Sequence, residues 1–234
     1  MTQTFSAATV EGQQYDIAGP YSNASRSTLF GAIESHFADA TDDDVSILYI
    51  CAHGSGSYGP TGEYAFSLDN THHVMASELM SRLERIKGRV ILIMDSCYSG
   101  GIIDCNKSRL DAQDGRISIL ASSHRNTNSC YWNVSQKLTS VDFFTHALLQ
   151  GIGFNEAQGI GGDRGWFRTD GGPADDAGNG DGLVTVSELF SYAKSTTLAN
   201  LAKYKGRPEF HGNPAQTPQS YIGEMNKDLV LFSR

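Results

Sequence analysis

A histidine and a cysteine, each placed just after a short apolar run, are the residues of this sequence best suited to chemistry. The run 45–51 leads into His53, and the run 89–94 leads into Cys97. A cysteine is a useful nucleophile near neutral pH when a base or a positive field lowers the pKa of its thiol, and a neighbouring histidine supplies either. We therefore take Cys97 as the candidate nucleophile and His53 as the candidate base.

Both apolar runs have the pattern of buried strands in a parallel sheet. They are short and rich in β-branched residues, as is a third run at 116–121. Between the first two lies an amphipathic segment, 75–87, whose apolar residues recur every three to four positions. A strand–helix–strand crossover sets its two strands side by side, and ligands bind outside the carboxyl ends of such strands. We expect the imidazole of His53 and the thiol of Cys97 to share that edge.

The remaining periodic segments predict one α/β domain spanning residues 1–234. Further helices and one last strand are expected at 27–38, 142–149, 185–204 and 228–232. Ser25 is the expected cap of the first of these helices. The segment 2–15 offers at best one weak strand, and the glycine-rich segment 151–182 is expected to be a long surface loop. Alternating strands and helices imply a mainly parallel sheet with helices on both faces.

Composition excludes several classes of protein. Apolar residues make up 39% and charged residues 19% of the 234 positions, which are values of a folded globular chain. Lys and Arg number 18 against 26 Asp and Glu, and the net charge of −8 disfavours nucleic acid and anionic membranes as partners. No apolar run approaches the roughly 18 residues that span a bilayer, and no signal segment follows Met1, so a soluble protein is expected, either cytoplasmic or secreted from a longer precursor.

The cysteines give no support for a metal site. The four lack a C-x-x-C pair, and their spacing matches no zinc template. We expect mostly free thiols and no required cofactor.

Taken together, the two strand ends resemble the caspase-fold cysteine peptidases of clan CD, a group that includes metacaspases and clostripain-like peptidases. In that group a strand ending in His-Gly precedes the nucleophile strand by about 45 residues, as strand-His-Gly precedes strand-Asp-Ser-Cys-Tyr-Ser-Gly here. The segments 181–189 and 213–219 also resemble parts of metacaspase-like bacterial proteins, and the resemblance covers about residues 20–234. It implies a caspase-like three-layer fold and a peptidase with His53 as base and Cys97 as nucleophile.

Two residues beside this dyad have expected roles. Gly54 opens the segment Gly-Ser-Gly, which we expect to form a turn where a substrate approaches the backbone, so the amides of Gly54 and Cys97 would hold an oxyanion. In the resembled family the residue two before the nucleophile helps floor the substrate pocket. Here that residue is Asp95, which implies cleavage after Arg or Lys, with Arg favoured by its bidentate fork. The alternative is that Asp95 caps the following turn.

The sequence also departs from the family. The strand end 121–125 offers no second acid for a basic-specific pocket, and the first strand and helix of the caspase fold are not found upstream. We expect those two elements to precede this segment in a longer parent or to come from elsewhere. A catalytically silent caspase-like module that binds peptides therefore remains the alternative function.

Two further patterns in the sequence resemble ligand sites. The segment 177–188 matches a calcium loop at its third, fifth, sixth and twelfth positions, but Ala177 stands where the first carboxylate belongs. Calcium is therefore an alternative ligand, and a calcium-responsive binding domain is a third candidate. The competing interpretation is a glycine-rich turn followed by a helix capped by Thr185 or Ser187. The segment 54–59 also fits G-x-G-x-x-G, yet no helix is predicted at its third glycine, which argues against a dinucleotide site.

Overall fold

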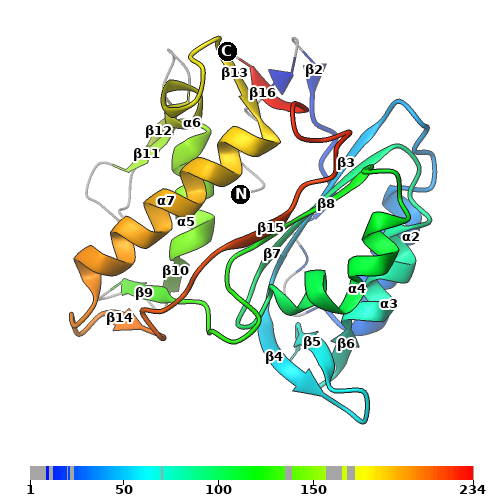
Figure 1. Ribbon diagram of the computed structural model, residues 1–234, viewed down its shortest axis with the longest axis horizontal. Coiled ribbons are helices and arrows are strands. Elements are labelled where there is room, and N and C mark those ends of the chain that lie inside the picture. The colour runs from blue at the N-terminus through cyan, green and yellow to red at the C-terminus, as the bar shows by residue number, and fades with distance from the viewer. Residues whose placement is uncertain are drawn as a thin grey trace. The chain divides into compact units, whose positions relative to one another are not determined.

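Figure 1 shows a computed structural model of the chain, in which the described residues are 9–10, 13–19, 21, 24–69, 71–134, 139–156, 165–167 and 172–233. The chain divides into two compact units. The sheet unit comprises Pro20–Asn128 and Thr217–Asn226, and the helix unit comprises Met1–Gly19, Ser129–Gln216 and Lys227–Arg234. The single domain expected from the chain length stays a prediction, and each unit is described by itself.

The sheet unit contains a four-stranded sheet in the order β15-β8-β7-β3. Its strands are β3 Val45–Cys51, β7 Arg89–Asp95, β8 Ile117–Ala121 and β15 Gln219–Tyr221. β7 is parallel to both β3 and β8, whereas β15 runs antiparallel to β8. The positions of the predicted strands and the α/β class with a mainly parallel sheet are therefore confirmed, but the predicted burial of 45–51 was wrong, because β3 is a half-buried strand at the end of the sheet.

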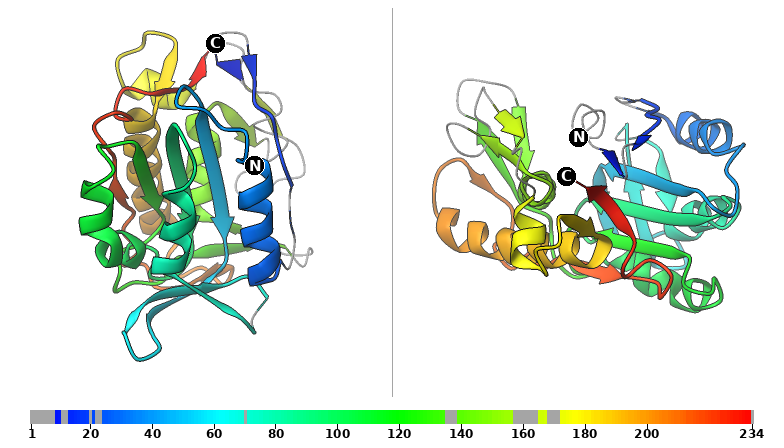
Figure 2. Two further views of the ribbon diagram at one scale, coloured as in Figure 1. Left: turned by 90° about the vertical axis from the view of Figure 1, so that its right-hand side faces the viewer. Right: turned by 90° about the horizontal axis from the view of Figure 1, so that it is seen from above.

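Three helices of this unit share one hydrophobic core with the sheet. They are α2 Arg26–His36, α3 Ala76–Leu83 and α4 Gly101–Asp111, and α3 packs against both of the others (Figures 1 and 2). Val90, Leu92 and Met94 of β7 join this core, and alternation along a strand puts these three on one face of the sheet. The described helices of the sheet unit thus cover one face, and the caspase-like three-layer arrangement stays a prediction.

A second, antiparallel sheet follows β3. It is formed by β4 His53–Tyr58, β5 Glu63–Ser67 and β6 His73–Met75. The expectation of a turn at Gly54–Gly56 was wrong, because these residues lie in β4. Alternating Gly and Ser carry no β propensity, so the strand is specified by its pairing with β5. The actual hairpin turn uses Gly59 and Gly62, whose φ angles are 65° and 63°.

The helix unit is built around two packed helices, α5 Phe143–Gly151 and α7 Val186–Tyr204. Its described strands are β1 Thr9–Val10, β2 Gln13–Gln14, β9 Tyr131–Val134, β10 Thr139–Asp142, β11 Phe154–Glu156, β12 Gly165–Phe167, β13 Leu183–Thr185, β14 Phe210–His211 and β16 Val230–Ser233. The expected helices and last strand are confirmed. No helix within the described residues is long and apolar enough to cross a membrane.

The glycine-rich segment differs from its prediction as one long loop. It holds the hairpin of β11 and β12 and the short helix α6 Pro173–Ala177. Phe154, Trp166 and Phe167 supply the β-forming residues of that hairpin, and Pro173 starts α6 at a position where a missing N–H costs nothing. The parts 157–164 and 168–171 of the expected loop lie outside the described residues.

Candidate active site

The parallel pair β3 and β7 brings the two predicted catalytic segments to one edge of the sheet. Cys51 is the register partner of Asp95, and the Ala52 N–H donates to the Asp95 carbonyl at 3.1 Å. His53 then opens β4, and Cys97 lies two residues beyond the end of β7. Both residues therefore follow the carboxyl ends of neighbouring parallel strands, as expected. His53 is exposed and Cys97 is half-buried.

Backbone contact between Gly54 and Cys97 is the closest link between the segments. A Cβ atom added at Gly54 would collide with the Cys97 carbonyl oxygen and lie 2.9 Å from Ser96 Oγ. At Gly56 an added Cβ would lie 3.1 Å from Tyr98 Cδ1. Residues 96–100 are here named the thiol turn. β4 thus runs along the first three of them, and glycine is required at position 54, where the two backbones approach.

The thiol turn holds one residue in an unusual backbone conformation. Tyr98, directly after Cys97, has φ 60°, a left-handed value that bulky residues rarely adopt. Its N–H donates to the Thr127 carbonyl at 2.9 Å, and the N–H of Gly100 donates to the Ser123 carbonyl at 2.8 Å. Such strain persists where surrounding bonds over-determine it, and it concentrates at active sites.

A buried set of hydroxyls lies under the thiol turn. This hydroxyl cluster consists of Tyr64, Ser96, Ser99, Ser122 and Ser123, none of them more than 3% exposed. The Ser96 N–H donates to Ser122 Oγ at 3.1 Å, and the Ser99 N–H donates to Ser123 Oγ at 3.0 Å. In return the Ser123 hydroxyl donates to the Ser96 carbonyl at 2.9 Å. The end of β8 therefore fixes the backbone that carries Cys97.

Tyr64 connects β5 to the same cluster. Its Oη lies 2.5 Å from Ser96 Oγ, and the Ser96 hydroxyl donates to the Cys97 carbonyl at 3.2 Å. Because Ser96 has one proton and uses it on Cys97, Tyr64 is the donor to Ser96. Burial raises the pKa of Tyr64, and the nearby charges of Cys97 and Asp95 raise it further, so the phenol stays protonated.

Sequence analysis did not single out the hydroxyl cluster. The available signal is that polar residues follow two buried strands directly, at 96–99 and 122–123. Which of these hydroxyls bond to which backbone groups depends on tertiary approach, and it could not be derived from spacing.

Asp95, the predicted pocket floor, is 1% exposed. Among the described residues it lines neither a cavity of about 50 Å³ near Gly100 and Arg125 nor a larger cavity in the helix unit. Its role toward a substrate stays a prediction. An acid that sequence analysis did not consider, Asp104 of α4, lies at the smaller cavity and pairs with Arg125 at 3.2 Å. It was missed because the search for a second acid followed the strand end alone.

The calcium-like segment has a structural explanation in its own hydrogen bonds. Thr185 caps α7, as one of the two expected caps, and the Glu188 carboxylate accepts the Thr185 N–H at 3.0 Å and hydroxyl at 2.9 Å. Glu188 also accepts the Asn179 N–H at 3.2 Å, and Asp175, which is 0% exposed, accepts the Gly182 N–H at 3.2 Å. These carboxylates are used by the backbone of the turn.

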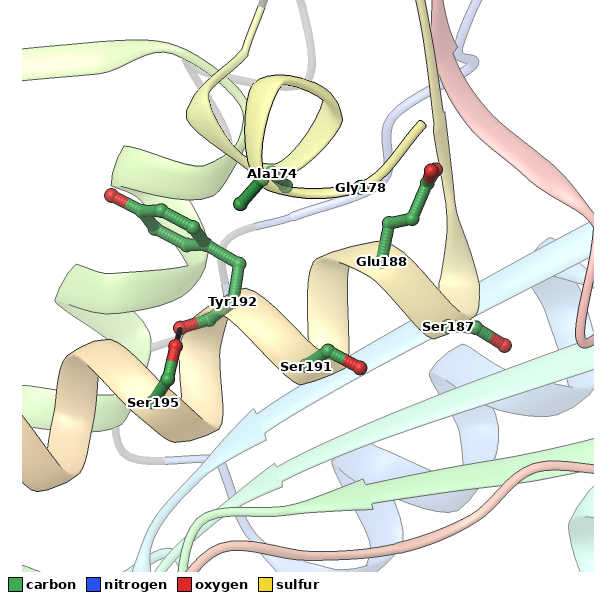
Figure 3. Close-up of a pocket in the computed structure, with 8 residues that line it drawn as sticks. Ala174, Gly178, Ser187, Glu188, Ser191, Tyr192 and Ser195 are labelled. Carbon is green, nitrogen blue, oxygen red and sulfur yellow. Dashed lines mark hydrogen bonds between the residues drawn. The ribbon is translucent and has the colours of Figure 1, made fainter. Parts of the chain in front are cut away.

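Figure 3 shows the cavity beside this segment, about 320 Å³ in volume, with Glu188, Ser191 and Ser195 of α7 along it. In the part of the chain that the structure describes, no three or more His, Cys, Asp or Glu side chains are grouped to hold a metal ion. Calcium binding at 177–188 stays a prediction.

Comparisons with known proteins do not place the chain in a family. No family model matches the sequence, and no curated protein matches it. Among solved structures, the chain is similar to protein GSU0716 from Geobacter sulfurreducens, at 14% identity and a TM-score of 0.47. That similarity covers 90% of this chain and 79% of the other. At this level it carries no argument about the site.

Proposed function

We propose that the protein is a cysteine endopeptidase that cleaves peptide or protein substrates with a Cys97–His53 dyad. The observation that supports this most is the packing of the Gly54 backbone against the Cys97 carbonyl at the carboxyl edge of β3 and β7. It sets the segment bearing the base against the segment bearing the nucleophile. The resemblance of both strand ends to the caspase-fold peptidases supports the same function.

The proposed reaction has two covalent stages. His53 accepts the thiol proton while Cys97 Sγ attacks the carbonyl carbon of the scissile bond, and the amides of Gly54 and Cys97 stabilise the oxyanion. The C–N bond then breaks, His53 gives the proton to the departing amine, and a thioester remains. Water, deprotonated by His53, attacks the thioester, breaks the C–S bond and restores the thiol.

Cleavage after Arg or Lys is the proposed specificity. Asp95 supplies a carboxylate two residues before the nucleophile, and a buried carboxylate prefers a cationic partner and rejects an acidic one. Arg gains more than Lys because its planar fork bonds both carboxylate oxygens.

The test is a set of initial rates on fluorogenic peptides ending in Arg, Lys, Asp or Asn, with and without calcium. Cys97→Ala should abolish cleavage, whereas Cys51→Ala, which removes an exposed thiol of the same unit, should retain it. Activity that survives in Cys97→Ala contradicts the assignment. A folded native protein that cleaves none of these peptides would instead support the silent binding module.

A further inference from the structure

We propose that Ser67 is a positioning residue for His53, accepting a ring N–H and so fixing the tautomer whose other nitrogen takes the proton of Cys97. This inference rests on the proposed function and deepens it by adding a third member to the dyad.

The register of the second sheet places Ser67 directly opposite His53. β4 pairs His53 with Ser67, and β5 pairs Ser67 with His73. Directly opposed residues of antiparallel strands share a face, with Cβ atoms about 4.5–5.5 Å apart. Ser67 therefore lies between two imidazoles in one row. The adjacent row, Gly54 and Phe66, faces the other side of the sheet, where Phe66 belongs to the core.

The hydroxyl of Ser67 is buried without a hydrogen-bond partner. The residue is 5% exposed, and its Oγ has no partner among the described residues. Native proteins pair nearly all buried polar side chains, so such a group calls for an explanation. An apolar residue at this place would cost less stability than an unpaired hydroxyl. The serine is therefore best explained by a partner that reaches it through rotation of a neighbouring side chain.

His53 is the better placed of the two neighbouring imidazoles for that partnership. The ring of His73 is stacked on Tyr58, with ring centroids 4.0 Å apart and an interplanar angle of 15°. His53 is exposed at the start of its strand, so its ring can turn without breaking a packed contact. A rotation about the side-chain bonds of His53 brings a ring N–H to Ser67 Oγ, which has two lone pairs available.

A third group that orients the base is a common feature of nucleophile–base pairs. A neutral imidazole has one donor nitrogen and one acceptor nitrogen, and only the acceptor can take a thiol proton. A hydrogen bond to Ser67 assigns the donor role to one nitrogen and leaves the other for Cys97. Catalytic hydrogen bonds of this kind are often long in a substrate-free enzyme and shorten when substrate binds.

The test compares Ser67→Ala with Ser67→Thr, which keeps the hydroxyl. For Ser67→Ala we expect an unchanged or higher melting temperature, because an unpaired hydroxyl is removed, together with a kcat lower on the order of tenfold or more and a KM within about twofold. Ser67→Thr should recover most of the kcat. A merely structural serine would lower stability and activity together.

Thr197→Val is the matched control. Thr197 is also a buried residue, 0% exposed, whose hydroxyl has no partner within the described part of the chain, but it lies on α7 in the helix unit. Thr197→Val should likewise have an unchanged or higher melting temperature, and its kcat should equal that of the native protein.

Nitrogen-15 NMR of the His53 imidazole, assigned by its loss in His53→Gln, gives a readout that does not require activity. One tautomer in the native protein and a mixture in Ser67→Ala support the proposal. An unchanged tautomer ratio and an unchanged kcat in Ser67→Ala overturn it while the peptidase assignment stands. The native protein could cleave none of the peptides while Ser67→Ala still changes the tautomer ratio of His53. That result would refute the peptidase assignment and support the hydrogen bond between His53 and Ser67.

Discussion

The thiol turn of the sheet unit and the glycine-rich turn at 178–188 of the helix unit both suggest a functional site from their sequences. Different kinds of groups bind their backbones. Serine hydroxyls that directly follow β8 bind the backbone of the thiol turn. In the glycine-rich turn the carboxylates of Asp181 and Glu188, which suggested calcium, themselves accept backbone N–H groups.

The two turns differ in the groups that bind their backbones. Carboxylates that accept the backbone N–H groups of their own turn need no cation to satisfy them, whereas the thiol turn is bound by hydroxyls of a neighbouring segment. The comparison therefore favours a structural role for the carboxylates at 178–188 and leaves the proposed chemistry to 96–100.

Of the substitutions that test this comparison, Gly54→Ala is expected to have the largest effect on activity. The new methyl group collides with the Cys97 carbonyl, so either β4 or the thiol turn must shift, at a cost of about 1–3 kcal/mol in unfolding free energy. Displacement of the oxyanion donors should lower kcat/KM roughly 100-fold or more. Gly31→Ala is the control, because an added Cβ there meets nothing within 4 Å in α2, and it should stabilise by about 0.5–1 kcal/mol. Full activity in Gly54→Ala would refute the close approach.

Asp95→Asn should have the next largest effect on activity. Losing a charged partner for the substrate guanidinium costs about 1.5–3 kcal/mol, which lowers kcat/KM for Arg peptides by roughly 10- to 150-fold. Cleavage of uncharged peptides and the melting temperature should change far less. The control is Asp111→Asn, because that exposed acid belongs to a surface pair with Lys107. Equal activity of Asp95→Asn and the native protein on Arg peptides would leave only the turn-capping role.

Tyr64→Phe tests the hydrogen bonds that support the thiol turn, and we expect a smaller effect than from Asp95→Asn. It removes one buried hydrogen bond to Ser96, and we expect a loss of about 0.5–1.5 kcal/mol in unfolding free energy and a several-fold lower kcat. Denaturant unfolding and steady-state kinetics measure both. Tyr221→Phe, which deletes an exposed hydroxyl on Asp111, should change neither. A kcat in Tyr64→Phe equal to that of the native protein would show that the phenol does not support the turn.

Glu188→Ala should have the smallest effect on activity. It removes the capping box of α7 and costs about 0.5–2 kcal/mol of stability, with kcat unchanged. Thermal unfolding with and without calcium checks this together with the ligand question. Calcium that raises the melting temperature of the native protein but not of Glu188→Ala would reverse the interpretation of this turn as structural.

Parts of the fold follow from residue composition and from the periodic spacing of apolar residues. The runs 45–51 and 89–94 had to be strands because they are rich in β-branched and apolar residues, and their order along the chain favoured ends that meet. That reasoning places His53 and Cys97 at one edge of the parallel sheet from the sequence alone. Burial was predicted correctly for β7, whereas β3 lies at the end of the sheet and is mostly half-buried. β4 could not be found in the same way, because Gly-Ser-Gly has neither propensity nor alternation.

Contacts between distant segments account for what the sequence could not predict at the site. Ser67 and Tyr64 are two near-neighbours of one strand, yet one is opposed to His53 and the other reaches Ser96. Their roles depend on strand register and on which face enters the core, and a shift by one residue would place Phe66 or Leu68 opposite His53 instead of Ser67. The register of β4 and β5 cannot be derived from the spacing of residues in the sequence.

The antiparallel strand β15 has a consequence for how the protein is made. Gln219 pairs with Ala121, and Gly223 and Asn226 bond to Ser118 through its hydroxyl. At synthesis rates of about 5–20 residues per second, roughly 5–20 s separate the two strands on the ribosome. During that interval the β8 edge has no neighbour from its own sheet. The sheet that carries the thiol is therefore completed only after residue 221 has been made, which makes its open edge a target for chaperones or for mispairing in the nascent chain.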